Sequence, residues 1–97
     1  MGGTPLWKLS SGCFAGWRLG DLMYDADGRN VGYFIGDAAY GPDGRYVGEV
    51  YGGDRIGRRM GVAHPVAGAR AALASRGVTR LADTLGMPLG GWDDPTF

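Results

Sequence analysis

The 97-residue sequence has few of the side chains from which catalytic and metal sites are usually built. It contains one histidine, His64, and one cysteine, Cys13. A single cysteine excludes an intramolecular disulfide and suits a reducing compartment, so we expect a cytoplasmic protein. Without a second thiol or a histidine cluster, we expect neither a bound metal nor another cofactor. We therefore expect a protein that is not an enzyme, with His64 and an Asp21 and Asp37 carboxylate pair as its only candidates for acid–base chemistry.

Long hydrophobic runs are also absent. No stretch approaches the about 20 apolar residues that a membrane-spanning helix needs, so we expect no membrane span. Aromatic residues are missing from residues 52–91, whereas nine of them fall within the first 51. The sequence therefore divides into an aromatic part and a later part of different composition.

Glycine, in contrast, is abundant and regularly spaced, with 20 residues in all. Residues 19–34 and 35–50 repeat each other with a shift of 16 positions, and weaker copies extend to either side. A glycine at a fixed position of a repeat indicates a positive φ in a turn or a close approach of two chains. We predict that Gly28 and Gly44 lie in turns, and that Gly16, Gly32 and Gly48 lie within strands.

Each repeat has the pattern of a β-hairpin, with Asp-Gly between two β-prone runs. All connections are short, so the strands should form an up-and-down array of about eight, closed to leave no free edges. The predicted fold class is all-β: four sequential antiparallel β-hairpins, one per 16-residue repeat, around a pseudo-four-fold axis. Strict alternation within one strand places Val31 and Tyr33 on one face and Phe34 on the other.

The composition changes after Arg59, and residues 61–97 are alanine-rich with several Gly and Pro residues. Pro65 followed by alanines predicts a short helix over residues 67–75, and a second is predicted over residues 78–85. We thus predict a repeat domain over residues 5–60 and a short helical or extended C-terminal arm over residues 61–97. Trp92 in this arm should dock on the β body or on a neighbouring copy.

The unit Tyr-x-x-x-Gly-Arg-x-Val-Gly occurs at residues 24–32 and 40–48. It resembles the repeat of the bacterial four-fold β-flower proteins, over residues 5–60. The resemblance implies four β-hairpins arranged as petals, with Lys8 and Ile56 at the tyrosine position of the outer copies. It carries over no catalytic residue, because the function of that family is not established. A loose likeness of the family to Tubby-type lipid-binding domains suggests a hydrophobic ligand.

A second resemblance is to the YD-repeats of large secreted shells. Tyr24 and Asp25 fit that short motif, but the next copy has Tyr40 followed by Gly41. Such repeats also form long arrays, so we rank this resemblance below the first.

The charges are unevenly distributed, although the formal net charge is zero. Residues 19–54 carry seven acids against two arginines, and residues 55–80 carry six arginines and no acid. One interpretation is a basic arm lying over an acidic body. The alternative is phosphate or nucleic-acid binding through Arg55, Arg58 and Arg59, which we rank lower.

Aromatic rings repeated around an axis can line a ligand cavity. The candidate ligand-binding residues are Trp17, Tyr24, Tyr33 and Tyr40, with core packing as the alternative role of all four. We accordingly predict a non-catalytic binding or protein-interaction module. Its expected partners are a small hydrophobic ligand, another protein, or a second copy of itself.

Overall fold

The computed structural model describes residues 3–97 and consists of β-strands and connecting segments, with no helix in that range. The strands are β1 (Gly3–Lys8), β2 (Phe14–Leu19), β3 (Leu22–Asp25), β4 (Asn30–Ile35), β5 (Ala38–Tyr40), β6 (Tyr46–Tyr51), β7 (Arg55–Arg59) and β8 (Trp92–Asp93). Each strand from β2 to β7 pairs antiparallel with the one before it. The all-β fold with sequential hairpins is therefore confirmed.

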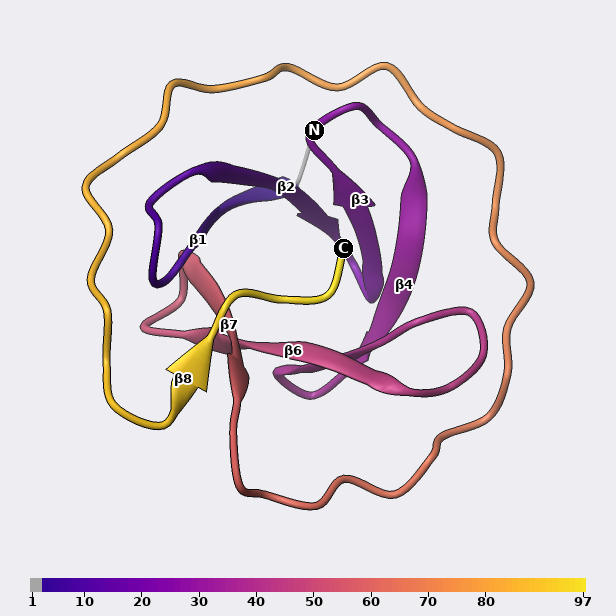
Figure 1. Cartoon of the computed structure of the whole chain (residues 1–97). Coiled ribbons are helices and arrows are strands. Elements are labelled where there is room, and N and C mark those ends of the chain that lie inside the picture. The colour runs from indigo at the N-terminus through magenta and orange to yellow at the C-terminus, as the bar shows by residue number, and fades with distance from the viewer. Residues whose placement is uncertain (1–2) are drawn as a thin grey trace.

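The sheet closes on itself through β1 and β7, which pair in parallel at Trp7 with Arg55 and at Lys8 with Ile56. A barrel of seven up-and-down strands is odd-numbered, so its first and last strands must run in the same direction. Three hairpins, β1–β2, β3–β4 and β5–β6, form complete petals around the axis (Figure 1). The fourth petal has β7 as its first strand and β8, which lies outside the barrel, as its return strand.

The three complete petals share a β-bulge at one position of the repeat. The pairing shifts after Leu6, Met23 and Ala39, so that Ala15, Val31 and Val47 have no opposite residue. An unpaired residue interrupts the alternation of side chains along its strand. As a result, Val31 packs against the core together with Phe34. The prediction that Val31 shares a face with Tyr33 rather than Phe34 was wrong for this reason.

The core lies inside the barrel along its axis. Its fully buried members include Leu6, Met23, Ala39 and Ile56, one from the first strand of each petal. Phe97 packs against this cluster from the C-terminal tail, and that end of the chain lies near the axis in Figure 1. Side chains therefore fill the axis of the flower.

The strand pairings also change which residue of the first repeat corresponds to the tyrosine of the other repeats. Trp7 opposes Phe14 just beyond its bulge, as Tyr24 opposes Asn30 and Tyr40 opposes Tyr46. The first hairpin is one residue longer than the others, so Trp7, not Lys8, takes the tyrosine position there.

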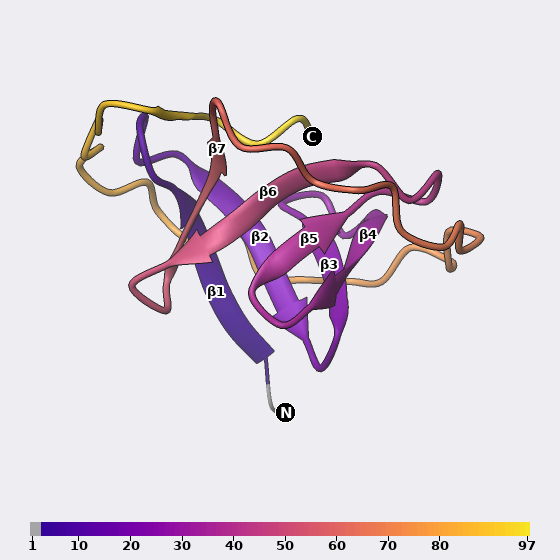
Figure 2. The same cartoon turned by 90° about the horizontal axis from the view of Figure 1, so that it is seen from below.

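Residues 60–91, called the belt below, run around the outside of the barrel from β7 to β8 (Figure 1). The turned view in Figure 2 shows that most of this segment passes outside the petals. It meets the tips of the third, second and first petals in that order. Ala67 N–H donates to Gly44 O (2.7 Å), Arg76 N–H to Gly28 O (2.8 Å) and Thr84 N–H to Gly12 O (2.7 Å).

The two helices predicted for the belt are absent, and chain length gives a physical reason. The molecule measures 34 × 33 × 18 Å, so a circuit of its edge is roughly 100 Å. An extended segment of 32 residues can span about 105 Å, whereas the same segment with both predicted helices formed would span only about 75 Å. Alanine-rich composition favours a helix only weakly, and tertiary contacts override it here.

Candidate functional site

The outward-pointing side chains of the petals form an aromatic surface beneath the belt, called the outer face below. Its members are Trp7, Phe14, Trp17, Tyr24, Tyr33, Tyr40 and Tyr46. Six of the rings form two runs of neighbours, with centroids 5.7 to 6.3 Å apart: Trp7, Phe14 and Trp17 in one, and Tyr33, Tyr40 and Tyr46 in the other. Three of the rings meet an arginine or histidine of the belt. The aromatic repeats are thus brought together, but the belt covers them.

The tips of the petals are shaped to let the belt approach. Gly28 and Gly44 have φ values of 85° and 81°, which confirms both as turn glycines. A Cβ at Gly28 would overlap Arg76 O, and one at Gly44 would overlap Ala67 O. The repeated glycine therefore serves the turn and the belt contact together.

The side chains at one position of the repeat contact the belt through their polar end groups. Trp17 Nε1–H donates to Thr79 O at 2.7 Å, and the Tyr33 hydroxyl donates to Gly68 O. The equivalent residue of the third petal is Glu49, whose Oε1 lies 4.0 Å from His64 Nε2. Positions 17, 33 and 49 thus contact the belt at three successive places.

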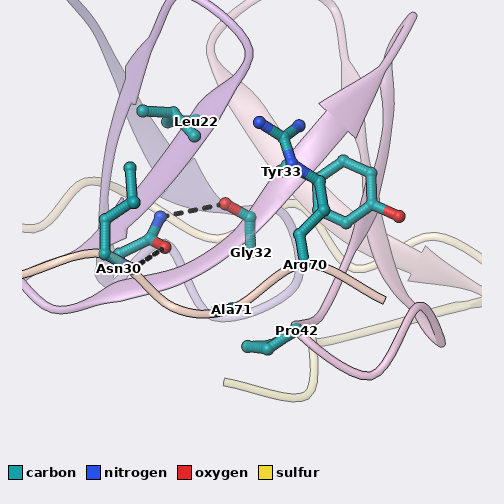
Figure 3. A pocket seen from close by; sticks show the side chains of 8 residues that line it. Leu22, Asn30, Gly32, Tyr33, Pro42, Arg70 and Ala71 are labelled. Atoms are coloured by element: carbon teal, nitrogen blue, oxygen red, sulfur yellow. Dashed lines mark hydrogen bonds between the residues drawn. The ribbon is translucent and has the colours of Figure 1, made fainter. Parts of the chain in front are cut away.

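The first cavity lies between the second petal and the belt and measures about 270 Å³ (Figure 3). The Asn30 amide donates to Gly32 O and Met23 O at 3.1 Å each, and its Oδ1 accepts from Leu73 N–H. The Arg70 guanidinium lies over the ring of Tyr33, and an Arg70 N–H donates to Asp21 Oδ2 at 3.3 Å. The polar side chains of this cavity are committed to holding the belt.

The second cavity, of about 350 Å³, lies between the first petal and the belt. Half-buried Trp17 and Leu19 form the petal side, and Arg76, Gly77, Val78 and Thr79 form the belt side. Ligand sites commonly occupy about 300 to 1,000 Å³ and combine apolar walls with a few polar groups. This cavity meets that description, whereas the first is smaller and its polar side chains already form hydrogen bonds within the chain.

The third petal carries a group of titratable side chains at the start of the belt. The imidazole of His64 stacks on Tyr46, whose hydroxyl donates to Glu49 Oε1 at 2.9 Å and accepts from Arg59 N–H at 2.9 Å. Burial raises the pKa of Tyr46 to about 12, assisted by the Glu49 carboxylate and opposed by the bond from Arg59. Glu49 also pairs with Arg59 at 3.4 Å.

The Arg55, Arg58 and Arg59 side chains each meet an acid. Arg55 lies 3.9 Å from Asp54, Arg58 lies 3.6 Å from Asp93, and Arg59 pairs with Glu49. Arg55 also donates to Thr84 Oγ1 at 2.6 Å. Their guanidinium groups therefore join β7 to neighbouring segments of the same chain.

The four aromatic candidates occupy different environments. Tyr24 and Tyr40 are buried at 2% and 9% exposure and belong to no cavity wall described above. Tyr33 lines the first cavity and Trp17 the second. Sequence reasoning missed Arg70 and Arg76, because it ascribed the positive charge of the belt to general attraction. The only available signal was the contrast between the acidic residues 19–54 and the arginine-rich residues 55–80.

Within residues 3–97, no three His, Cys, Asp or Glu side chains gather as a metal site would require. No helix in that part of the chain could span a membrane.

Comparison with known proteins gives one match. The model of a family described as "4-fold beta flower protein" matches residues 10–88. That range covers most of the chain and extends through most of the belt, further than the residues 5–60 that the repeat alone suggested. No curated protein and no solved structure matches. With three complete petals, a fourth closed by β8, and this match over more than half its length, the chain belongs to the 4-fold beta flower family.

Proposed function

We propose that this protein is a non-catalytic binding module that holds a small, largely apolar ligand between its outer face and its belt. The site is the cavity of about 350 Å³ beside Trp17. One observation carries the proposal: this cavity is walled by Trp17, Leu19 and Val78, which are all half-buried. Burying apolar ligand surface against such walls contributes about 25 cal/mol per Å².

The alternative of phosphate or nucleic-acid binding has less support. Arg55, Arg58 and Arg59 are each engaged with an acid of the same chain. A phosphate would have to displace those carboxylates, whereas an apolar ligand can enter the second cavity without breaking an ion pair.

Gly77 offers a way to test the cavity without disturbing its walls. It lines the cavity, its φ is not in the left-handed region, and no atom lies within 4 Å of the position of an added Cβ. A Gly77→Phe variant should therefore fold and fill the cavity. The matched control is Gly90→Phe, because Gly90 is equally unobstructed but lies outside the cavity.

The measurement is the binding of octanol, a neutral apolar probe, detected by ligand-observed NMR. Wild type and Gly90→Phe should bind it, and Gly77→Phe should not. Native mass spectrometry of the purified protein would additionally reveal a ligand carried from the cell. Failure of wild type to bind octanol, or equal binding by both variants, would remove the proposal.

A further inference from the structure

The belt carries three arginines whose surroundings differ. Arg70 pairs with Asp21 at 3.3 Å and Arg80 pairs with Asp27 at 3.2 Å. Within residues 3–97, no carboxylate lies at ion-pair distance from Arg76. Arg76 is also the one of the three that lines the second cavity.

The main chain of Arg76 is held in place, so its side chain extends from a fixed point. Its N–H donates to Gly28 O at 2.8 Å, and its carbonyl lies against the Gly28 Cα. The guanidinium lies 5.7 Å from the ring centroid of Tyr24, near the outer limit of about 6 Å for a cation–π contact. The five N–H donors of the guanidinium have no side-chain or carbonyl acceptor in the described chain, and Arg76 is exposed to solvent.

The rest of the cavity wall is apolar at the petal side. Trp17 directs its one donor, Nε1–H, to Thr79 O, so that bond is already made and the indole presents its ring to the cavity. Leu19 and Val78 add aliphatic surface. The cavity thus has an apolar body and a single cationic group at its belt side.

We propose that this cavity binds a small carboxylate with an apolar body, whose carboxylate is bound by Arg76. The inference rests on the proposed function and adds the chemical class of the ligand. A planar guanidinium matches a carboxylate through two parallel N–H···O bonds. The volume of about 350 Å³ is roughly twice that of an apolar cavity that holds benzene, which suits a medium-length acyl chain.

The test compares octanoate with octanol, which share a chain length and differ in charge. Because the guanidinium is exposed and screened, the gain from the charge pair is modest. Calorimetry at low ionic strength should give octanoate an affinity about fivefold higher than octanol. Added salt should reduce this ratio.

Two variants localise the effect. Arg76→Gln should bind both probes with the weaker affinity of octanol. Arg29→Gln is the control, since Arg29 is also exposed, directly follows Gly28, which the Arg76 main chain contacts, and does not line the cavity. It should retain the octanoate preference.

The outcomes separate this inference from the proposed function. Absence of binding by either probe contradicts the proposed function itself. Equal affinity of wild type for both probes, or a preference that survives in Arg76→Gln, overturns the carboxylate site while leaving an apolar one. Tighter binding of octyl phosphate than of octanoate also overturns the assignment, because it would show a general anion site.

Discussion

The imidazole of His64 lies parallel to the ring of Tyr46, with centroids 3.6 Å apart and planes 9° apart. His64 lies near the start of the belt, and Tyr46 begins the return strand of the third petal. The stack therefore fixes the belt to the barrel soon after it leaves β7. It also shields a tyrosine whose hydroxyl is bonded on both sides, to Glu49 and to Arg59 N–H.

The raised pKa of Tyr46 predicts a pH dependence of stability at high pH. Its folded-state pKa of about 12 lies above the usual value of 10, mainly because burial disfavours the phenolate. The neutral form thus stabilises the fold below pH about 10, and this contribution is lost as pH rises to about 12. Urea unfolding across this range should show the decline, and Tyr46→Phe should lack it. An identical decline in the variant would contradict the assignment.

Gly28 should be less replaceable than Gly36, although both have positive φ values, 85° and 62°. Alanine in the left-handed region costs about 1–2 kcal/mol at either site. At Gly28 the added Cβ also overlaps Arg76 O, whereas at Gly36 it meets nothing within 4 Å. Gly28→Ala should therefore lose at least about 1 kcal/mol more than Gly36→Ala in the free energy of unfolding, by denaturant titration.

Limited proteolysis should also distinguish these two variants. Gly28→Ala should expose the belt around Arg76 to trypsin faster than Gly36→Ala does. Equal stability and equal cleavage of the two variants would show that the belt does not depend on the tip of the second petal.

The barrel was predictable because its information is local and repeated. Asp-Gly turns at Gly28 and Gly44 and glycines at fixed strand positions give the same result in each copy. The bulge at Val31 was missed, because strict alternation of side chains assumes that every residue of a strand has a partner on the next strand. The register of the first petal was missed because a single extra residue moves Trp7 into the tyrosine position.

The belt was mispredicted because its conformation is set by distant residues. Alanine spacing near Ala67 and Ala74 favours a helix locally, but the N–H groups of Ala67, Arg76 and Thr84 bond to petal tips far away in sequence. The candidate site could not be fully predicted for the same reason. Trp17 could be proposed from the repeat, whereas Arg76 becomes a neighbour of Trp17 only when the belt has closed around the barrel.

Phe97 should contribute to stability through the core of the barrel. It is half-buried and packs against the cluster of Leu6, Met23 and Phe34. Phe97→Ala should cost about 1–2 kcal/mol, below the about 3–5 kcal/mol typical of a fully buried phenylalanine. Thr96→Ala is the control, since Thr96 is exposed and its contact to Val47 O comes from its main chain. Thermal unfolding that treats the two variants alike would place Phe97 outside the core in solution.

Hydrogen exchange should distinguish a docked belt from a loose one, residue by residue. The amides of Ala67, Arg76 and Thr84 donate to carbonyls of the three petal tips, so they should exchange slowly despite lying outside regular secondary structure. Ala74 lies between two of these anchors and donates to no acceptor within residues 3–97, so its amide should exchange rapidly.

NMR-detected exchange measures these amides individually, with the amide of Met23 in β3 as the protected reference. Alternating protection along the belt is the expected pattern, because the bonded amides, which also include those of Arg70 and Leu73, are separated by amides without an acceptor, such as that of Ala74. Uniformly fast exchange from Ala67 to Thr84, with Met23 still protected, would mean that the belt leaves the barrel in solution. Both cavities would then be open on one side, because the belt supplies one wall of each.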